Sequence, residues 1–242
     1  MTVRETAFTL DTSSIKYGAG TTHEVGFDMA TYSVKRVMLV TDPNLSNSEP
    51  VQIALDALAA ADIDAVKFDG TRIEPTDVSF KEAIAFAQDG SFDGFVAVGG
   101  GSCIDTAKIA NLYATHPTDD FLDYVNPPLG NGKPIPGKLK PLIAIPTTAG
   151  TGSETTSVAV FDLLEQHVKT GISHRAMRPA LGIIDPLNTA TMPPLVAASS
   201  GLDVLSHAIE SLTAIPYDAK AAVVASISIA LPDQISLMGF DP

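Results

Sequence analysis

The sequence predicts an α/β fold built on a doubly wound parallel sheet. Short apolar runs alternate along the chain with longer segments whose apolar residues recur at helical spacing. Such alternation is typical of parallel strands connected by helices that cover the sheet. Three of the apolar runs lead directly into polar or glycine-rich turns: Asp42, the glycines at 99–101 and the threonine-rich segment 147–154.

The first half of the chain supplies three strands and their helices in order. An early segment at 14–18 precedes a helix expected at about 22–30. Apolar runs bounded by turn residues predict strands at 37–42, 65–68 and 95–98. Helices are predicted at 51–61, whose apolar residues have amphipathic spacing, at 80–88, which Gly90 stops, and from Ser102 to about 114.

The second half continues the pattern with one interruption. Residues 126–140 are rich in proline, glycine and lysine, which predicts a surface loop. Apolar runs predict strands at 141–146 and 180–184, two hairpin arms at 158–161 and 168–172, and a helix from Leu195 onward.

Composition bounds the class of protein. The 242 residues suffice for one large or two smaller domains, and 45% hydrophobic with 18% charged residues describe a globular protein with a substantial core. A net charge of −13 argues against nucleic acid or anionic membrane as a partner. The single cysteine excludes a disulfide framework or thiolate metal cluster and fits a reducing compartment.

The N-terminal segment and the apolar runs of the sequence indicate in which cellular compartment to expect the protein. Residues 1–20 contain no apolar core typical of a secretory signal, and Glu5 and Asp11 are unlike a typical organelle transit peptide. No apolar run reaches the length of a membrane span. We therefore expect a soluble, intracellular protein, in the cytoplasm or alternatively in the mitochondrial matrix.

The glycines at 99–101 form the first candidate site. A strand that breaks on glycines and enters a helix exposes unpaired N–H groups in the first helical turn, which together with the helix dipole suit a phosphate. Glycine is required where a Cβ would hold the ligand away from the backbone. The alternative is a tight turn in which Ser102 only caps the helix, because the spacing is not the G-x-G-x-x-G pattern.

The three polar turns predict one shared crevice. Ligands of parallel sheets lie beyond the carboxyl ends of the strands, so this arrangement favours a dinucleotide. Asp42 would accept hydrogen bonds from the adenosine ribose and repel a 2′-phosphate, which favours NAD over NADP. The alternative is that Asp42 caps its own turn. The segment 147–154 offers hydroxyls and flexible backbone but no base.

A second constellation lies in the final helix. Asp203 and His207 are four residues apart, which places a carboxylate and an imidazole on one helical face, as in half of a divalent metal site. The alternative is that Ser200 and Asp203 form a capping box and that His207 is a surface residue. No G-x-S-x-G elbow or Ser-His-Asp order indicates a hydrolase.

From about Ser14 to Lys220 these stretches together resemble the iron-containing (group III) alcohol dehydrogenases. The resemblance is carried by VTD at 40–42, GGGSCIDTAK at 99–108, PTTAGTGSE at 146–154, IDP at 184–186 and GLDVLSHAIES at 201–211. Within the family, the stretches 121–134, 141–162, 175–186 and 214–220 are most similar to the hydroxyacid–oxoacid transhydrogenases.

The resemblance implies a Rossmann-like dinucleotide-binding domain at 1–190 and the start of an all-helical metal-binding domain at 191–242. It implies hydride transfer through NAD between a small hydroxyacid and an oxoacid, with 4-hydroxybutyrate and 2-oxoglutarate giving succinate semialdehyde and 2-hydroxyglutarate. It also implies a divalent metal, iron or zinc, and a homo-oligomer. The expected ligands are Asp42 for the adenosine ribose; Gly99, Gly100, Gly101 and Ser102 for the pyrophosphate; Thr147, Thr148, Thr151 and Lys169 for the diphosphate and nicotinamide side; and Asp203 and His207 for the metal.

Two departures from the family pattern stand out. Glu74 occupies a position where many of these dehydrogenases carry asparagine, which bears on the adenine side. The family's two further histidine ligands lie on later helices, whereas no histidine follows His207, and the tail at 221–242 lacks helical periodicity. We therefore expect a truncated product that holds metal weakly. The alternatives are an inactive NAD-binding fragment that assembles with a full-length partner, a general iron-containing alcohol dehydrogenase, and a non-redox phosphate-binding module.

Overall fold

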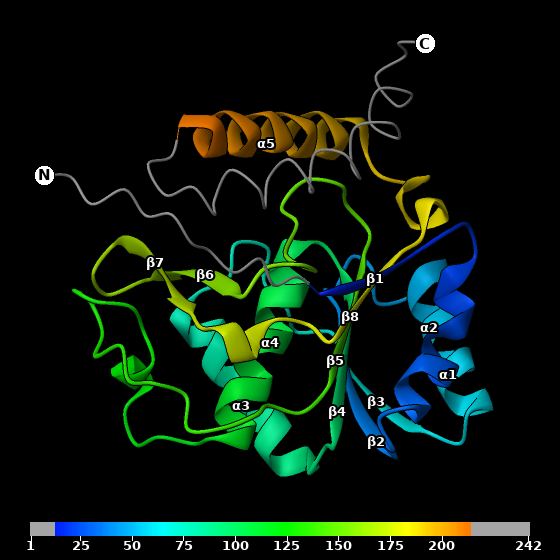
Figure 1. Cartoon of the computed structure of the whole chain (residues 1–242), viewed down its shortest axis with the longest axis horizontal. Coiled ribbons are helices and arrows are strands. Elements are labelled where there is room, and N and C mark those ends of the chain that lie inside the picture. Colours follow the sequence, from blue (N-terminus) through cyan, green and yellow to red (C-terminus); the bar gives the residue numbers. More distant parts are fainter. Residues whose placement is uncertain (1–12, 214–242) are drawn as a thin grey trace, which may run out of the picture.

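A six-stranded, wholly parallel sheet forms the centre of the molecule (Figure 1). The computed structural model describes residues 13–213, with the side chains of the last helix described as far as Glu210. The strands are ordered β1-β8-β5-β4-β2-β3, and a separate antiparallel hairpin pairs β6 with β7. Their bounds are β1 Ser14–Tyr17, β2 Arg36–Val40, β3 Asp64–Phe68, β4 Gly94–Gly99, β5 Leu142–Pro146, β6 Val158–Leu163, β7 Val168–Ser173 and β8 Leu181–Ile184.

Helices cover both faces of the sheet, with α1 and α2 on one side and α3 and α4 on the other (Figure 1). The fifth helix, α5, lies above the carboxyl edge of the sheet. The bounds are α1 Val25–Ala30, which follows a 3-10 turn at Thr21–Glu24, then α2 Glu49–Ala60, α3 Asp77–Gly90, α4 Gly101–Thr115 and α5 Pro194–Thr213.

Side chains of each strand alternate between two cores. Leu39 and Val96 pack with α1 and α2, whereas their neighbours Met38 and Ala97 pack with α3 and α4. Every residue of β4 is buried. Burial on both faces explains why the strands appear in the sequence as continuous apolar runs rather than as alternating ones. The predicted doubly wound α/β fold is confirmed.

The strand order reverses between β2 and β4. From β2 the chain moves outward to β3, then crosses back to the other side of β2 and continues through β4 and β5. Ligands of open parallel sheets bind at this kind of switch point, outside the carboxyl ends of the strands. Asp42 follows β2 and the glycines follow β4, so the topology brings two of the three predicted turns to the switch point.

The predicted hairpin is confirmed and extends the core. Phe161 on β6 packs against Phe80 on α3 with ring centroids 5.2 Å apart. Ile172 on β7 belongs to the same buried cluster as Ile109 and Leu112 of α4. The hairpin also meets the loop before α3, because the amide of Asp162 donates to the carbonyl of Pro75 at 2.9 Å. It therefore lies beside the carboxyl edge of the sheet.

Several element ends differ from the sequence prediction. Helix α3 begins at Asp77 rather than at residue 80, because Thr76 and Ser79 cap each other's backbone amides in a capping box. The segment 126–140 contains neither helix nor strand, as expected of a surface loop. The predicted tail at 221–242 lies outside the described residues, and the domain boundary at 190 remains a prediction.

Candidate functional site

The glycine turn joins β4, in which every residue is buried, to α4, which is buried from Cys103 to Tyr113. Helix α4 has Gly100 as its N-cap, and no side chain hydrogen-bonds the amides of its first turn. Ser102 lies inside the helix, so the alternative in which Ser102 caps it is wrong. The amides of Cys103 and Ile104 donate to the Gly100 carbonyl at 3.0 and 3.3 Å, which leaves the amides of Gly101 and Ser102 to a ligand or to water. The helix dipole favours an anion there.

Two of the three glycines are required by close packing. Gly99 has φ +155°, and a Cβ there would lie 2.4 Å from Cys103 Sγ. A Cβ on Gly101 would lie 2.8 Å from Thr151 Oγ1. Gly100 has an ordinary φ of −72°, and its Cβ would lie 3.4 Å from Thr148 Oγ1, within normal contact. Gly100 is therefore the glycine that packing does not demand.

The threonine-rich loop lies against this turn. The amide of Thr147 donates to the carbonyl of Gly99 at 3.1 Å, and Thr148 and Thr151 are the residues that substituents on Gly100 and Gly101 would meet. The structure thus brings together the predicted residues of the glycine turn and of this loop. Together they form a backbone cradle edged with hydroxyls at the carboxyl ends of β4 and β5.

Asp42 joins the same site through Cys103. Its Oδ1 accepts the amides of Asn44 at 2.8 Å and Leu45 at 3.2 Å, so the carboxylate does cap its own turn. Its Oδ2 lies 3.6 Å from Cys103 Sγ. Burial, and then the charge of Asp42, raises the pKa of the Cys103 thiol well above its usual value, so the thiol stays protonated and donates. A ribose contact would have to use Oδ2.

No described contact joins Lys169 to the glycine turn. It lies on β7 with its side chain 57% exposed, and its Nζ is 4.0 Å from an oxygen of Asp162. Because Asp162 hydrogen-bonds Pro75, Lys169 belongs to the hairpin side of the carboxyl edge. Its role toward the diphosphate remains a prediction.

Three ionisable groups near the site, two of them buried and one half-buried, were not singled out from the sequence. Asp105 and Lys108 lie in α4 and interact at 3.4 Å, and Glu154 lies in the threonine-rich loop. Burial raises the pKa of Asp105 and of Glu154 and lowers the pKa of Lys108. The signal was present, because an i, i+3 Asp–Lys pair inside a helix buried on all sides must be satisfied internally.

Asp185, at the end of β8, closes the N-terminal segment onto the sheet. It accepts the amides of Gly20 at 2.9 Å, Thr22 at 3.0 Å and Leu187 at 3.1 Å, and the Thr22 hydroxyl at 2.8 Å. Burial alone raises the pKa of Asp185, but these hydrogen bonds outweigh it and hold the pKa below its usual value. Asp185 is a structural carboxylate.

Helix α5 carries the predicted metal ligands. His207 Nε2 lies 3.5 Å from Asp203 Oδ1, with the side chains 51% and 39% exposed. The helix meets the threonine-rich loop at Gly150, where a Cβ would lie 2.7 Å from Ser200 Cβ. Ser200 lies well inside α5 and its hydroxyl donates to the Val196 carbonyl at 2.8 Å, so the alternative in which Ser200 and Asp203 form a capping box is wrong.

The donors on α5 fit part of a metal site. One carboxylate and one imidazole suit iron or zinc, whose sites in enzymes use at least three protein ligands. Among residues 13–213, no group of three or more His, Cys, Asp or Glu side chains is arranged to hold a metal ion. The described residues therefore supply two donors and do not complete a metal centre.

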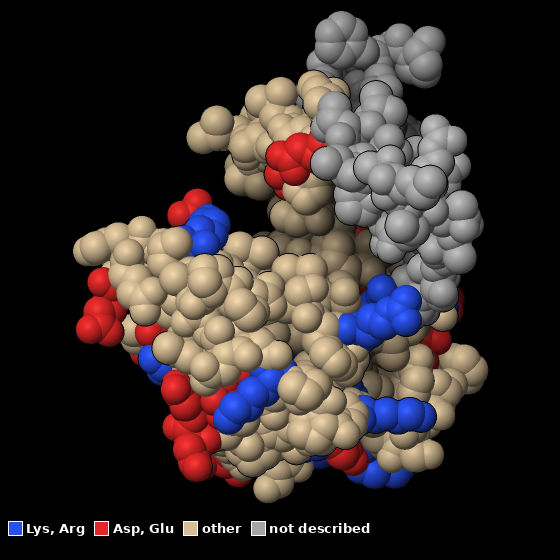
Figure 2. Space-filling view, turned by 60° about the vertical axis from the view of Figure 1, so that its left-hand side comes forward, with Lys and Arg blue, Asp and Glu red and all other residues tan. Residues whose placement is uncertain are grey.

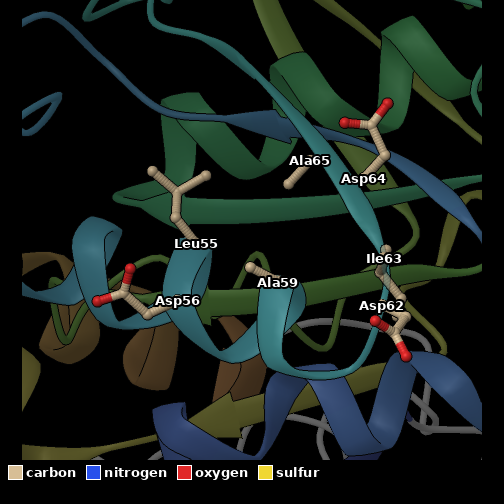
Figure 3. Close-up of a pocket in the computed structure, with 7 residues that line it drawn as sticks. All are labelled: Leu55, Asp56, Ala59, Asp62, Ile63, Asp64 and Ala65. Atoms are coloured by element: carbon tan, nitrogen blue, oxygen red, sulfur yellow. The ribbon is translucent and has the colours of Figure 1, made fainter.

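The surface shows where ligands could enter. Figure 2 shows it hollowed between the projecting α5 at the top and the body of the domain. A hollow of about 510 Å³ lies elsewhere, between the end of α2 and the start of β3. That hollow is at the amino end of β3, and its carboxylates Asp56, Asp62 and Asp64 point away from one another (Figure 3).

Over the part of the chain that is described, no helix is both long and apolar enough to cross a membrane.

Relatives share both the sequence and the fold. The family model "Iron-containing alcohol dehydrogenase" matches residues 12–186. The mitochondrial hydroxyacid-oxoacid transhydrogenases of Bos taurus and Homo sapiens are 57% and 56% identical over 215 residues, 89% of this chain. This chain spans 46% of the length of those relatives.

Solved structures agree. A 1,3-propanediol oxidoreductase superposes with a TM-score of 0.84 and 28% identity, covering 96% of this chain and 60% of its own. Sulfoacetaldehyde reductase from Bifidobacterium kashiwanohense, solved in complex with NAD+, gives 0.74 and 31%, covering 85% and 54%. The parallel sheet, its glycine turn and these matches together show that the chain belongs to the iron-containing alcohol dehydrogenase family.

Proposed function

We propose that this protein is an NAD-dependent oxidoreductase of the hydroxyacid–oxoacid transhydrogenase type. The observation that carries the proposal is the uncapped first turn of α4, which faces the threonine-rich loop at the switch point of the sheet. The names of the relatives support a hydroxyacid and an oxoacid as the substrate classes. Within those classes we propose 4-hydroxybutyrate and 2-oxoglutarate, the pair that the family resemblance implies. Their mitochondrial location favours the matrix over the cytoplasm for this chain.

The chain's own residues divide the binding of NAD among them. The amides around Gly100, Gly101 and Ser102 would hold the pyrophosphate, with Thr147 and Thr148 as hydroxyl neighbours and Lys169 as a cation on the hairpin side. Asp42 Oδ2 would accept from the adenosine ribose and disfavour a 2′-phosphate. NAD, when bound, supplies the hydride acceptor and donor.

Helix α5 would supply two ligands to a divalent metal. Asp203 and His207 would provide an oxygen and a nitrogen for iron or zinc. A divalent metal in such a site lowers the pKa of a substrate hydroxyl. Helix α5 touches the threonine-rich loop where Ser200 meets Gly150. Asp203 and His207 therefore lie on the helix that adjoins the cofactor cradle.

Binding and turnover are tested separately. Titration of the full chain with NAD and with NADP should show saturable binding with a preference for NAD, and a chain that binds neither contradicts the proposal. Conversion of 4-hydroxybutyrate and 2-oxoglutarate, followed by chromatography of both products, tests the reaction.

A second candidate is an NAD-binding fragment without turnover. The observation that favours it is the half-complete metal site on α5. Saturable NAD binding without product formation, at any added iron or zinc concentration, would identify it.

A further inference from the structure

An ion pair buried inside α4 has no part in the proposed chemistry. Lys108 is completely buried, and its Nζ donates to the carbonyl of Val158 at 2.8 Å and the hydroxyl of Thr156 at 3.1 Å. It lies 3.4 Å from Asp105 Oδ1. Both partners of Lys108 outside the helix belong to the segment that leads from the threonine-rich loop into β6, so Lys108 fastens that segment to α4.

Asp105, one turn before Lys108 in α4, also contacts the segment that leads into β6. Its Oδ2 accepts the amide of Val160 at 3.0 Å, and its carboxylate also accepts the hydroxyl of Ser153. Lys108 compensates the charge that burial would otherwise make costly. Asp105 is therefore held between the hairpin on one side and the threonine-rich loop on the other.

Ser153 carries the contact onward to the glycine turn. Its Oγ lies 3.1 Å from Thr151 Oγ1, and its amide donates to the same Thr151 oxygen at 3.2 Å. Because the Ser153 proton goes to the Asp105 carboxylate, the Thr151 proton goes to Ser153. The Thr151 hydroxyl is thereby committed inside the loop, and it lies where a Cβ on Gly101 would be 2.8 Å away.

We propose that Asp105 is a positioning residue for cofactor binding, which acts through Ser153 to hold Thr151 against Gly101. On this view Thr151 shapes the cradle rather than donating its hydroxyl to the phosphate. The inference rests on the proposed function, in which NAD binds at the glycine turn. It assigns the Asp105–Lys108 pair a purpose beyond stability, because the contacts through Ser153 fix the part of the loop that faces Gly101.

The test is a double-mutant cycle on the full chain, with NAD affinity and melting temperature measured in parallel. Ser153→Ala should raise the NAD Kd about five- to tenfold, as expected for one lost hydrogen bond. Asp105→Asn should raise it similarly alone and add nothing in the Ser153→Ala background, although it lowers the melting temperature in both. Asp77→Asn, which removes the charge of the Asp77–Lys81 pair on α3, serves as the matched control and should leave the Kd unchanged.

Either of two results overturns this inference and leaves the proposed function intact. One is an unchanged NAD Kd in Ser153→Ala, and the other is an Asp105→Asn effect on the Kd that is equally large in the wild-type and Ser153→Ala backgrounds. A wild-type chain without saturable NAD binding overturns the proposed function and this inference with it. Because Asp105 is buried, the cycle is repeated with Ser153→Ala and Thr151→Val, which change no charge. Full additivity in that second cycle also refutes the relay.

Discussion

Substitution of Gly100 separates cofactor binding from folding. Its φ of −72° is open to any residue, and an added Cβ would lie 3.4 Å from Thr148 Oγ1. Alanine is a poorer N-cap than glycine but restricts the unfolded chain, and these effects of up to about 1 kcal/mol oppose each other. We therefore expect Gly100→Ala to change the melting temperature by no more than about 4 °C.

NAD binding should respond much more strongly. A methyl group at this position keeps phosphate oxygens away from the first-turn amides, and each hydrogen bond to a charged group contributes about 1.5–3 kcal/mol. Loss of one such bond raises the Kd roughly 10- to 150-fold.

The measurement is an NAD titration by calorimetry or nicotinamide fluorescence, beside a thermal melt. Gly137→Ala is the matched control, because its Cβ would lie 3.5 Å from His116 Cε1 in a loop away from the site. A folded Gly100→Ala protein with wild-type NAD affinity would refute phosphate binding at this turn.

Three further predictions concern other residues. Asp42→Gly should narrow the NAD over NADP preference by about 1–3 kcal/mol by removing a charge beside the ribose position, and equal affinities in the wild type would exclude that role. The isolated chain should hold iron or zinc only weakly after gel filtration; one tightly held ion, lost in His207→Ala, would show that other groups complete the site. Asp185 has a lowered pKa, so its stabilisation is complete above the unfolded value near 3.8 and disappears as the pH falls through the lower folded value. Asp185→Asn should be less stable at neutral pH and lose less stability between pH 5 and pH 2 in acid titrations monitored by circular dichroism, and parallel curves would contradict this.

The sheet could be predicted from the sequence because its strands are buried on both faces. The run from Phe95 to Val98 has no polar residue and is followed directly by glycines, which together indicate a buried strand. Element ends were less accessible, since the start of α3 depends on a reciprocal cap between Thr76 and Ser79. The alternative in which Ser200 caps a helix is wrong for a related reason: α5 begins at Pro194, so Ser200 lies inside the helix.

The candidate site also has one part that the sequence predicts and one part that it does not. Glycines and threonines that touch along two adjacent strand ends could be predicted, because topology alone brings them together. The Asp105–Lys108 pair could not be interpreted, since its partners Thr156 and Val158 lie about fifty residues later. Spacing within a helix indicates that two charges meet, but only the tertiary structure shows what they fasten.

The pairing of β1 with β8 has a consequence for synthesis of the protein. Strand β1 ends at Tyr17, and its only sheet neighbour among the described residues ends at Ile184. Asp185, which ties down Gly20 and Thr22, emerges later still. At about 5–20 residues per second, the ribosome exposes the first strand on the order of ten seconds or more before its partner. During that interval β2, β3, β4 and β5 can pair with one another, whereas β1 has to wait for β8 before it can join the described sheet.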